Sequence, residues 1–90
     1  MKYVLREDIQ VDFFSDGEAV AYDRISEIMH VLNITAAMVL NILMKNEDNP
    51  EKAFMTEVWN YDPEVSASIL RNDFQNILSS FIEAELVIAR

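Results

Sequence analysis

Few residues of this chain could carry out chemistry, and they do not form a recognisable site. His30 is the only histidine and cysteine is absent, whereas a structural zinc site takes four ligands from those two residue types. Serine and threonine occur, but no histidine–acid arrangement is visible that would activate one of them as a nucleophile. Gly17 is the only glycine, so the glycine-rich loops that bind phosphates are excluded. The sequence therefore predicts a protein that is not an enzyme and holds no metal or cofactor.

Carboxylates are the one abundant functional group. Sixteen Asp and Glu residues stand against seven Lys and Arg residues, which gives a net charge of −9 and an isoelectric point near 4.3. Paired carboxylates can serve acid–base catalysis, but most of these lie in expected turns and helix starts, where solvation and capping account for them. Nucleic-acid binding depends on Lys and Arg meeting phosphates, and this chain would repel them. The acids either keep the protein soluble or face a partner that carries basic residues, and both interpretations stay open.

The length and hydropathy of the chain bound its class. Ninety residues suffice for one domain, so we expect a single unit over residues 1–90. No apolar run approaches the roughly 18–20 residues that cross a bilayer, and the apolar stretch near the start is too short for a secretory signal. With no cysteine to form disulfides, a cytoplasmic location without membrane contact is the simplest expectation.

The first third of the chain predicts a hairpin. Apolar residues alternate with polar ones on both sides of Asp16-Gly17, and Asp-Gly in that setting indicates two antiparallel strands joined by a two-residue turn. That turn predicts three facing pairs: Phe13 with Val20, Val11 with Tyr22, and Ile9 with Arg24. The first two pairs would place apolar partners together on one face of the sheet.

A third strand is expected at Glu27–Leu32, after a polar turn. One face of it carries Ile28, His30 and Leu32, and the other carries Met29 and Val31. Since both faces carry apolar side chains, one should lie on the core and the other is available to line a groove. If the strands pair in chain order, the third strand lies at the sheet edge with free N–H and C=O groups. Strand addition at such an edge is a standard way to bind an extended peptide.

Three helices are expected to follow the strands. Asn33 is suited to cap the first, whose apolar residues keep helical spacing to about Lys45. Asn49-Pro50-Glu51 opens the second, because Asn caps, Pro fits the first helical position and an acid meets the positive end of the helix dipole. Asp62-Pro63-Glu64 repeats that signal and predicts the start of a third helix that ends near Ala84. A short apolar tail follows and is expected to pack back on the core.

Four segments of the chain form a pattern that occurs together in one known family. They are Asp16-Gly17, Tyr22-Asp23, the strand-to-helix passage His30-Val31-Leu32-Asn33-Ile34-Thr35-Ala36-Ala37, and Glu85-Leu86-Val87 after the third helix. With these segments the chain resembles the PqqD-like proteins over about residues 5–88. Two departures occur: the turn at residues 23–27 lacks the glycine often found there, and Glu85 stands where the family commonly has glycine.

The resemblance implies a fold, a role and a site. The fold is α+β and winged helix-turn-helix-like, with a three-stranded antiparallel sheet followed by three helices. PqqD-like proteins are recognition elements in the biosynthesis of ribosomally made, post-translationally modified peptides. The implied role is therefore to capture the leader segment of a precursor peptide, without catalysis, and to present it to a separate modifying enzyme such as a radical SAM enzyme or a cyclase or protease. In the family the leader adds as a strand beside the third strand, in a cleft closed by the third helix. Carried onto this sequence, the peptide-binding residues are Glu27, Ile28, Met29, His30, Val31, Leu70, Asp73, Phe74 and Ile77.

Two other functions remain open on the sequence alone. Winged-helix transcription regulators have similar strand and helix elements, but the expected third helix carries only Arg71 as a cation, against the acids Glu64, Asp73 and Glu83. With a net charge of −9, such a protein is not expected to bind duplex DNA at moderate salt. A small scaffold subunit of another complex is the third alternative.

Overall fold

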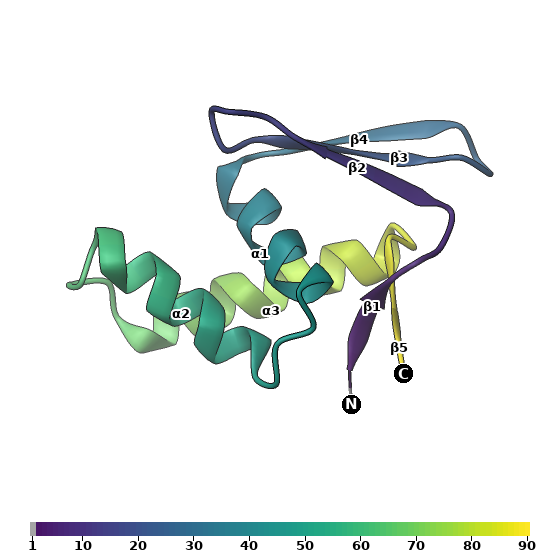
Figure 1. Ribbon diagram of the computed structural model, residues 1–90. Helices are drawn as coiled ribbons and strands as arrows, with labels where there is room; N and C mark the ends of the chain where they lie inside the picture. The colour runs from purple at the N-terminus through teal and green to yellow at the C-terminus, as the bar shows by residue number, and fades with distance from the viewer. Residues whose placement is uncertain (1) are drawn as a thin grey trace.

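The computed structural model describes residues 2–90, which form two antiparallel sheets and three helices. The larger sheet contains β2 (Ile9–Phe13), β3 (Ala19–Asp23) and β4 (Ile28–Leu32), and the smaller contains β1 (Tyr3–Leu5) and β5 (Val87–Ala89). The helices are α1 (Ile34–Met44), α2 (Pro50–Tyr61) and α3 (Ala67–Glu83). Figure 1 shows the larger sheet on one side of the helices, with β4 leading into α1. The predicted α+β arrangement of a three-stranded antiparallel sheet followed by three helices is confirmed.

The β2–β3 hairpin closes with a three-residue loop, not the predicted two-residue turn. The Phe14 N–H donates to the Glu18 carbonyl at 2.9 Å, and the Gly17 N–H donates to the Phe14 carbonyl at 3.1 Å. The Asp16 carboxylate accepts from the Glu18 N–H at 2.9 Å, and Gly17 has a φ of 95°, which favours glycine. The predicted pairs are therefore wrong by one residue: Ile9 faces Asp23, Val11 faces Ala21 and Phe13 faces Ala19.

This shift of one residue exchanges the two faces of β3. Ala19 and Ala21 are buried on the inner face, whereas Val20 and Tyr22 lie half-buried on the outer face. On β4 the predicted alternation is confirmed, because Leu32 is buried while Met29 and Val31 on the other face are 61% and 73% exposed.

Helices α1 and α2 begin where the sequence predicts. Asn33 caps α1, and its side-chain oxygen accepts from the Ala36 N–H at 2.9 Å. Asn49 caps α2 in the same way, accepting from the Lys52 N–H at 3.1 Å. Pro50 is the first residue of α2, where its missing N–H costs no helical hydrogen bond.

The predicted start of α3 is wrong by several residues. Asp62 forms the C-cap of α2, and residues 63–65 belong to the connection between the two helices. Ser66 is the N-cap of α3, and its hydroxyl accepts from the Ile69 N–H at 3.2 Å. The Trp59 indole N–H donates to the Val65 carbonyl at 2.7 Å, so the connection is held against α2 by a contact that the Asp-Pro-Glu pattern does not indicate.

The small sheet of β1 and β5 was not predicted, although the C-terminal tail was expected to pack back on the core. Tyr3 pairs with Ala89 and Leu5 with Val87. Beyond the pairs, Lys2 and Arg90 exchange two backbone hydrogen bonds, of 2.9 and 2.7 Å. Strands of three residues are too short for an alternation to be read from sequence.

The core lies between the sheets and the helices, and its largest members come from the helices. Phe54 of α2 and Phe74 of α3 meet with their ring centroids 5.8 Å apart. The fully buried large side chains are Val39, Leu40, Phe54, Leu86 and Val87.

Glu85 ends α3 with a backbone conformation that suits glycine. The Leu86 N–H donates to the Phe81 carbonyl at 2.9 Å and the Glu85 N–H to the Ile82 carbonyl at 3.0 Å. This is the Schellman arrangement, whose left-handed residue is usually glycine, and here Glu85 has a φ of 61°. Glu27, at the end of the β3–β4 turn, also has a φ of 61°. Both departures from the PqqD-like pattern thus fall at or beside left-handed positions occupied by glutamate.

We expect Glu85→Gly to raise the free energy of unfolding by about 0.5–1 kcal/mol. A left-handed residue other than glycine costs roughly 1–2 kcal/mol, and the larger chain entropy of glycine offsets roughly 0.5–1 kcal/mol of the gain. Urea unfolding measures the change. The matched control is Glu83→Gly in the last turn of α3, which should be destabilising. A loss of stability in Glu85→Gly as large as that in the control would contradict this account of the turn.

Candidate functional site

Strand β4 has an open edge, because the sheet order is β2-β3-β4 and β4 pairs only with β3 over the described residues. The hydrogen bonds from the Phe14 N–H to the Glu18 carbonyl and from the Arg24 N–H to the Asp8 carbonyl establish which residues of β3 face β2. Hydrogen-bonded and non-hydrogen-bonded pairs alternate along an antiparallel ladder. The backbone N–H and C=O groups of the even-numbered residues 18–24 therefore point toward β2, and those of the odd-numbered residues point toward β4.

This alternation identifies the free backbone groups. The backbone groups of Ala19, Ala21 and Asp23 point toward β4, where their partners are Leu32, His30 and Ile28. The backbone N–H and C=O groups of the remaining β4 residues, Met29 and Val31, therefore point toward the open edge. An extended peptide that pairs with β4 would hydrogen-bond to these two residues.

An open groove of about 340 Å³ runs along the C-terminal end of β4 and the C-terminal part of α3. Its lining residues are His30, Val31, Leu32, Asn33, Ala36, Ser80, Phe81, Ala84 and Leu86. No Asp, Glu, Lys or Arg is among them, although the protein as a whole is strongly acidic. The groove is thus suited to uncharged, mainly apolar side chains next to a free strand edge.

The predicted strand residues lie along this edge, with one exception. Ile28, Met29, His30 and Val31 belong to β4, and His30 and Val31 also line the groove. Glu27 lies before the strand, in the turn, where its N–H donates to the Asp23 carbonyl at 2.8 Å. The expected strand start at Glu27 is therefore one residue too early.

None of the four predicted α3 residues lines the groove. Leu70 and Phe74 are buried in the core, while Asp73 is exposed and Ile77 half-buried. Asp73 and Ile77 are separated by one helical turn and precede Ser80 and Ala84 on the same face of α3.

The α3 residues that line the groove are Ser80, Phe81 and Ala84, which the sequence analysis did not name. One feature of the sequence agrees with this position, because Ser80 of α3 and Ala84, the C-cap of that helix, are small residues four apart. Small side chains at that spacing leave space on one face of a helix.

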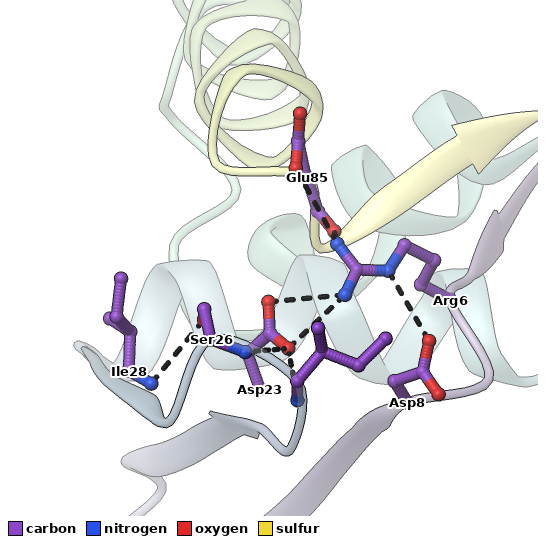
Figure 2. Close-up of polar contacts among 7 residues, drawn as sticks. Arg6, Asp8, Asp23, Ser26, Ile28 and Glu85 are labelled. Atoms are coloured by element: carbon purple, nitrogen blue, oxygen red, sulfur yellow. Dashed lines mark hydrogen bonds and ion pairs between the residues drawn. The ribbon is translucent and has the colours of Figure 1, made fainter.

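The Arg6 guanidinium links the end of β3 to the segment that follows α3 (Figure 2). Arg6, in the connection between β1 and β2, donates from Nη2 to both carboxylate oxygens of Asp23 at 3.1 Å. From Nη1 it donates to the Glu85 carbonyl at 2.8 Å. Asp23 ends β3 and Glu85 follows α3, so one side chain holds the turn before β4 and the end of α3 together. These partners lie 17 and 79 residues from Arg6, and no local sequence pattern indicates them.

Asp23 is buried and remains ionised in this arrangement. Burial acts to raise the pKa of Asp23, but the backbone N–H groups of Ser26 and Ile25, the Ser26 hydroxyl and the Arg6 guanidinium outweigh it, so the pKa lies below its ordinary value. The Ile25 and Ser26 N–H groups donate to Oδ1 at 2.9 and 3.2 Å. The same carboxylate therefore shapes the β3–β4 turn and binds Arg6.

The fold is that of proteins that have been solved in complex with leader peptides. TbiB1, in complex with the TbiA(beta) leader peptide, has a TM-score of 0.81 and 13% identity, covering 100% of this chain and 98% of its own. A lasso peptide synthetase B1, complexed with the leader peptide, has a TM-score of 0.80 and 22% identity, covering 99% of this chain and 100% of its own. No protein-family model matches the chain, and no curated protein is similar to it in sequence. The fold that the PqqD-like resemblance implied is confirmed by these two structures.

Two further findings concern membrane-spanning helices and metal sites. Over residues 2–90, no helix is both long and apolar enough to cross a membrane. Within that same part of the chain, no three His, Asp or Glu side chains come together in a way that could hold a metal ion.

We expect the stabilisation due to Asp23 to be lost in acid. A carboxyl group whose pKa is lowered by folding contributes its full stability above the ordinary Asp value of 3.8, and loses it as the pH falls through the lower pKa of the folded state. The difference in unfolding free energy between wild type and Asp23→Asn should thus be constant near neutral pH and shrink below that value. Urea unfolding over a pH series measures it, with the exposed Asp12→Asn as control. A difference that persists unchanged in strong acid would rule out this role of the ionised Asp23.

Proposed function

We propose that this protein binds the leader segment of a ribosomally synthesised precursor peptide by strand addition to β4, and presents it to a separate modifying enzyme. The observation that carries the proposal is the open edge of β4 beside an uncharged groove. Backbone pairing with Met29 and Val31 provides affinity, and the groove selects the side chains that point into it. The protein itself acts as a binding module and not as a catalyst.

The two structures with this fold support the proposal, because each is described as complexed with a leader peptide. They are similar to this chain in fold over almost its whole length, which includes the strand β4 and the helix α3 that line the groove. The PqqD-like sequence pattern, which includes His30-Val31-Leu32-Asn33 at the end of β4, points independently to the same role.

The partner enzyme in this proposal is a radical SAM enzyme, a cyclase or a protease that acts on the precursor peptide. We place the complex in the cytoplasm, where ribosomal precursors are made, and treat residues 1–90 as one peptide-recognition unit. Nucleic acid is not expected as a partner, since the net charge is −9.

The α3 wall of the groove in this proposal extends from Ala84 toward the N-terminus of the helix. Ser80 and Ala84 contact the leader directly, and Ile77 continues the same face by one turn. Leu70 and Phe74 act as buried support for that wall. Asp73→Ala tests whether the leader also contacts the next turn of α3 toward the N-terminus of the helix.

We expect Val31→Pro to weaken leader binding at least about tenfold, because proline removes an N–H that points to the open edge and each backbone hydrogen bond contributes roughly 1 kcal/mol or more. Val31→Ala, which keeps the N–H, should weaken it much less. Fluorescence anisotropy with a labelled leader peptide measures both. His30→Pro should instead disrupt the pairing of β3 with β4, since the His30 backbone pairs with Ala21.

The control for this prediction is proline on the other edge of the same sheet. Val11 of β2 faces Ala21, and its N–H points away from β3 by the same alternation. Val11→Pro should leave leader affinity within about twofold if the variant remains folded. Equal loss of affinity in Val11→Pro and Val31→Pro would count against addition at β4.

We also expect Ser80→Trp to block the groove. Ser80 is exposed, so a larger side chain should leave the fold intact while it occupies space that the leader needs. Ser79→Trp, one residue earlier and also exposed, projects about 100° away around the helix and serves as the matched control. Thermal melts and leader titrations on the two variants decide, and unchanged leader affinity in a folded Ser80→Trp would place the leader elsewhere.

A further inference from the structure

A second apolar surface contains Phe13, Phe14, Ile34 and Tyr61, which we call the hairpin patch. The exposed fractions of these side chains are 45%, 52%, 53% and 82%. They come from the β2–β3 hairpin, the first residue of α1 and the last residue of α2. Figure 1 shows these three places on the same side of the molecule. Large apolar side chains that gather on a surface usually mark an interaction site.

The hairpin patch surrounds a hollow of about 260 Å³. Ala37 and Met38 of α1 form part of the lining beneath the exposed side chains. Gly17 lies against Ile34, since a Cβ atom on Gly17 would be 3.4 Å from two carbons of that side chain. The hairpin loop is therefore seated on the start of α1, and the hollow has a preformed shape that a protruding side chain could enter.

The charges at the hairpin patch are all negative. Glu57 is the one charged residue that lines the hollow. Asp16 and Glu18 lie in the adjoining hairpin, close enough that hydrogen bonding to Asp16 and repulsion by it raise the pKa of Glu18. Asp62 follows Tyr61 directly. Two copies of this surface would bring like charges together, so a second copy of the chain is a poor occupant, and a basic partner is a good one.

The hairpin patch and the groove are lined by different residues, and both reach the start of α1. The residues that line the hollow belong to the hairpin, α1 and α2, whereas the groove is lined from β4, α3 and the start of α1 and ends at Leu86. The two share no lining residue. A protein that presents a bound leader needs a contact with the enzyme that does not displace the leader.

We propose that the hairpin patch is the docking site for the modifying enzyme, whose contact surface carries apolar side chains surrounded by Lys and Arg. This inference rests on the proposed function and adds to it the place and chemistry of the enzyme contact. Tyr61 and Phe14 insert as the apolar anchors, and Glu57 pairs with a basic residue of the enzyme.

The test uses the purified cyclase or protease that processes the precursor, titrated with the full-length protein in the absence of precursor. We expect Tyr61→Ser, Phe14→Ser and Glu57→Lys each to weaken enzyme binding about tenfold or more, as exposed aromatic anchors at interfaces do. Wild-type affinity should fall as salt rises. The matched controls are Ile25→Ser and Ile69→Ser, which remove apolar side chains 70% and 56% exposed outside the hairpin patch and should leave enzyme affinity within about twofold.

Leader titrations separate this inference from the proposed function. All of these variants should bind the leader with unchanged affinity, and a wild-type protein that binds no leader would overturn the proposed function and this inference together. If the leader binds but the hairpin-patch variants and the controls bind the enzyme equally well, only the docking site is overturned. Concentration-dependent dimerisation of the wild type that Tyr61→Ser abolishes would assign the hairpin patch to a second copy, and would also overturn the proposal.

Discussion

The Arg6–Asp23–Glu85 cluster joins the larger sheet to the segment that follows α3. Its guanidinium connects a buried carboxylate at the end of β3 with the carbonyl that follows α3. Both carboxylate oxygens of Asp23 accept from the same Nη2 atom, and hydrogen bonds between charged groups are stronger than neutral ones, so the cluster ties the end of β3 to the end of α3. The groove lies between β4 and the C-terminal end of α3, which are about 50 residues apart in the sequence, so its shape depends on how the sheet packs against that helix.

The backbone at both ends of this cluster turns through left-handed conformations. Glu27 and Glu85 each have a φ of 61°, one before β4 and the other after α3. The Glu27 N–H donates to the Asp23 carbonyl at 2.8 Å, and the Leu86 and Glu85 N–H groups form the Schellman turn, so both conformations are held without glycine. Local strain at these two turns is tolerated because the surrounding contacts determine the structure.

The sequence was sufficient to predict the order of the three strands of the larger sheet and the three helices, and the edge strand, since the helix caps at Asn33 and Asn49 and the alternation of β4 are local signals. It failed where the outcome depends on one residue or on distant contacts. The three-residue loop at Asp16 and Gly17 changed the hairpin register, because Asp-Gly is compatible with loops of both lengths. Ser80 and Ala84 became groove residues only once α3 was placed against the sheet, and the partners of Arg6 are remote in the chain.

The pairing of β1 with β5 has a consequence for how this fold can be combined with other proteins. Lys2 and Arg90 are joined by two backbone hydrogen bonds, so the first and last described residues leave the molecule side by side. Segments whose ends lie this close can be placed within a surface loop of a larger protein without opening their own fold. If the fold were inserted into an enzyme at that point, it would add an open strand edge and leave β4 and the groove exposed.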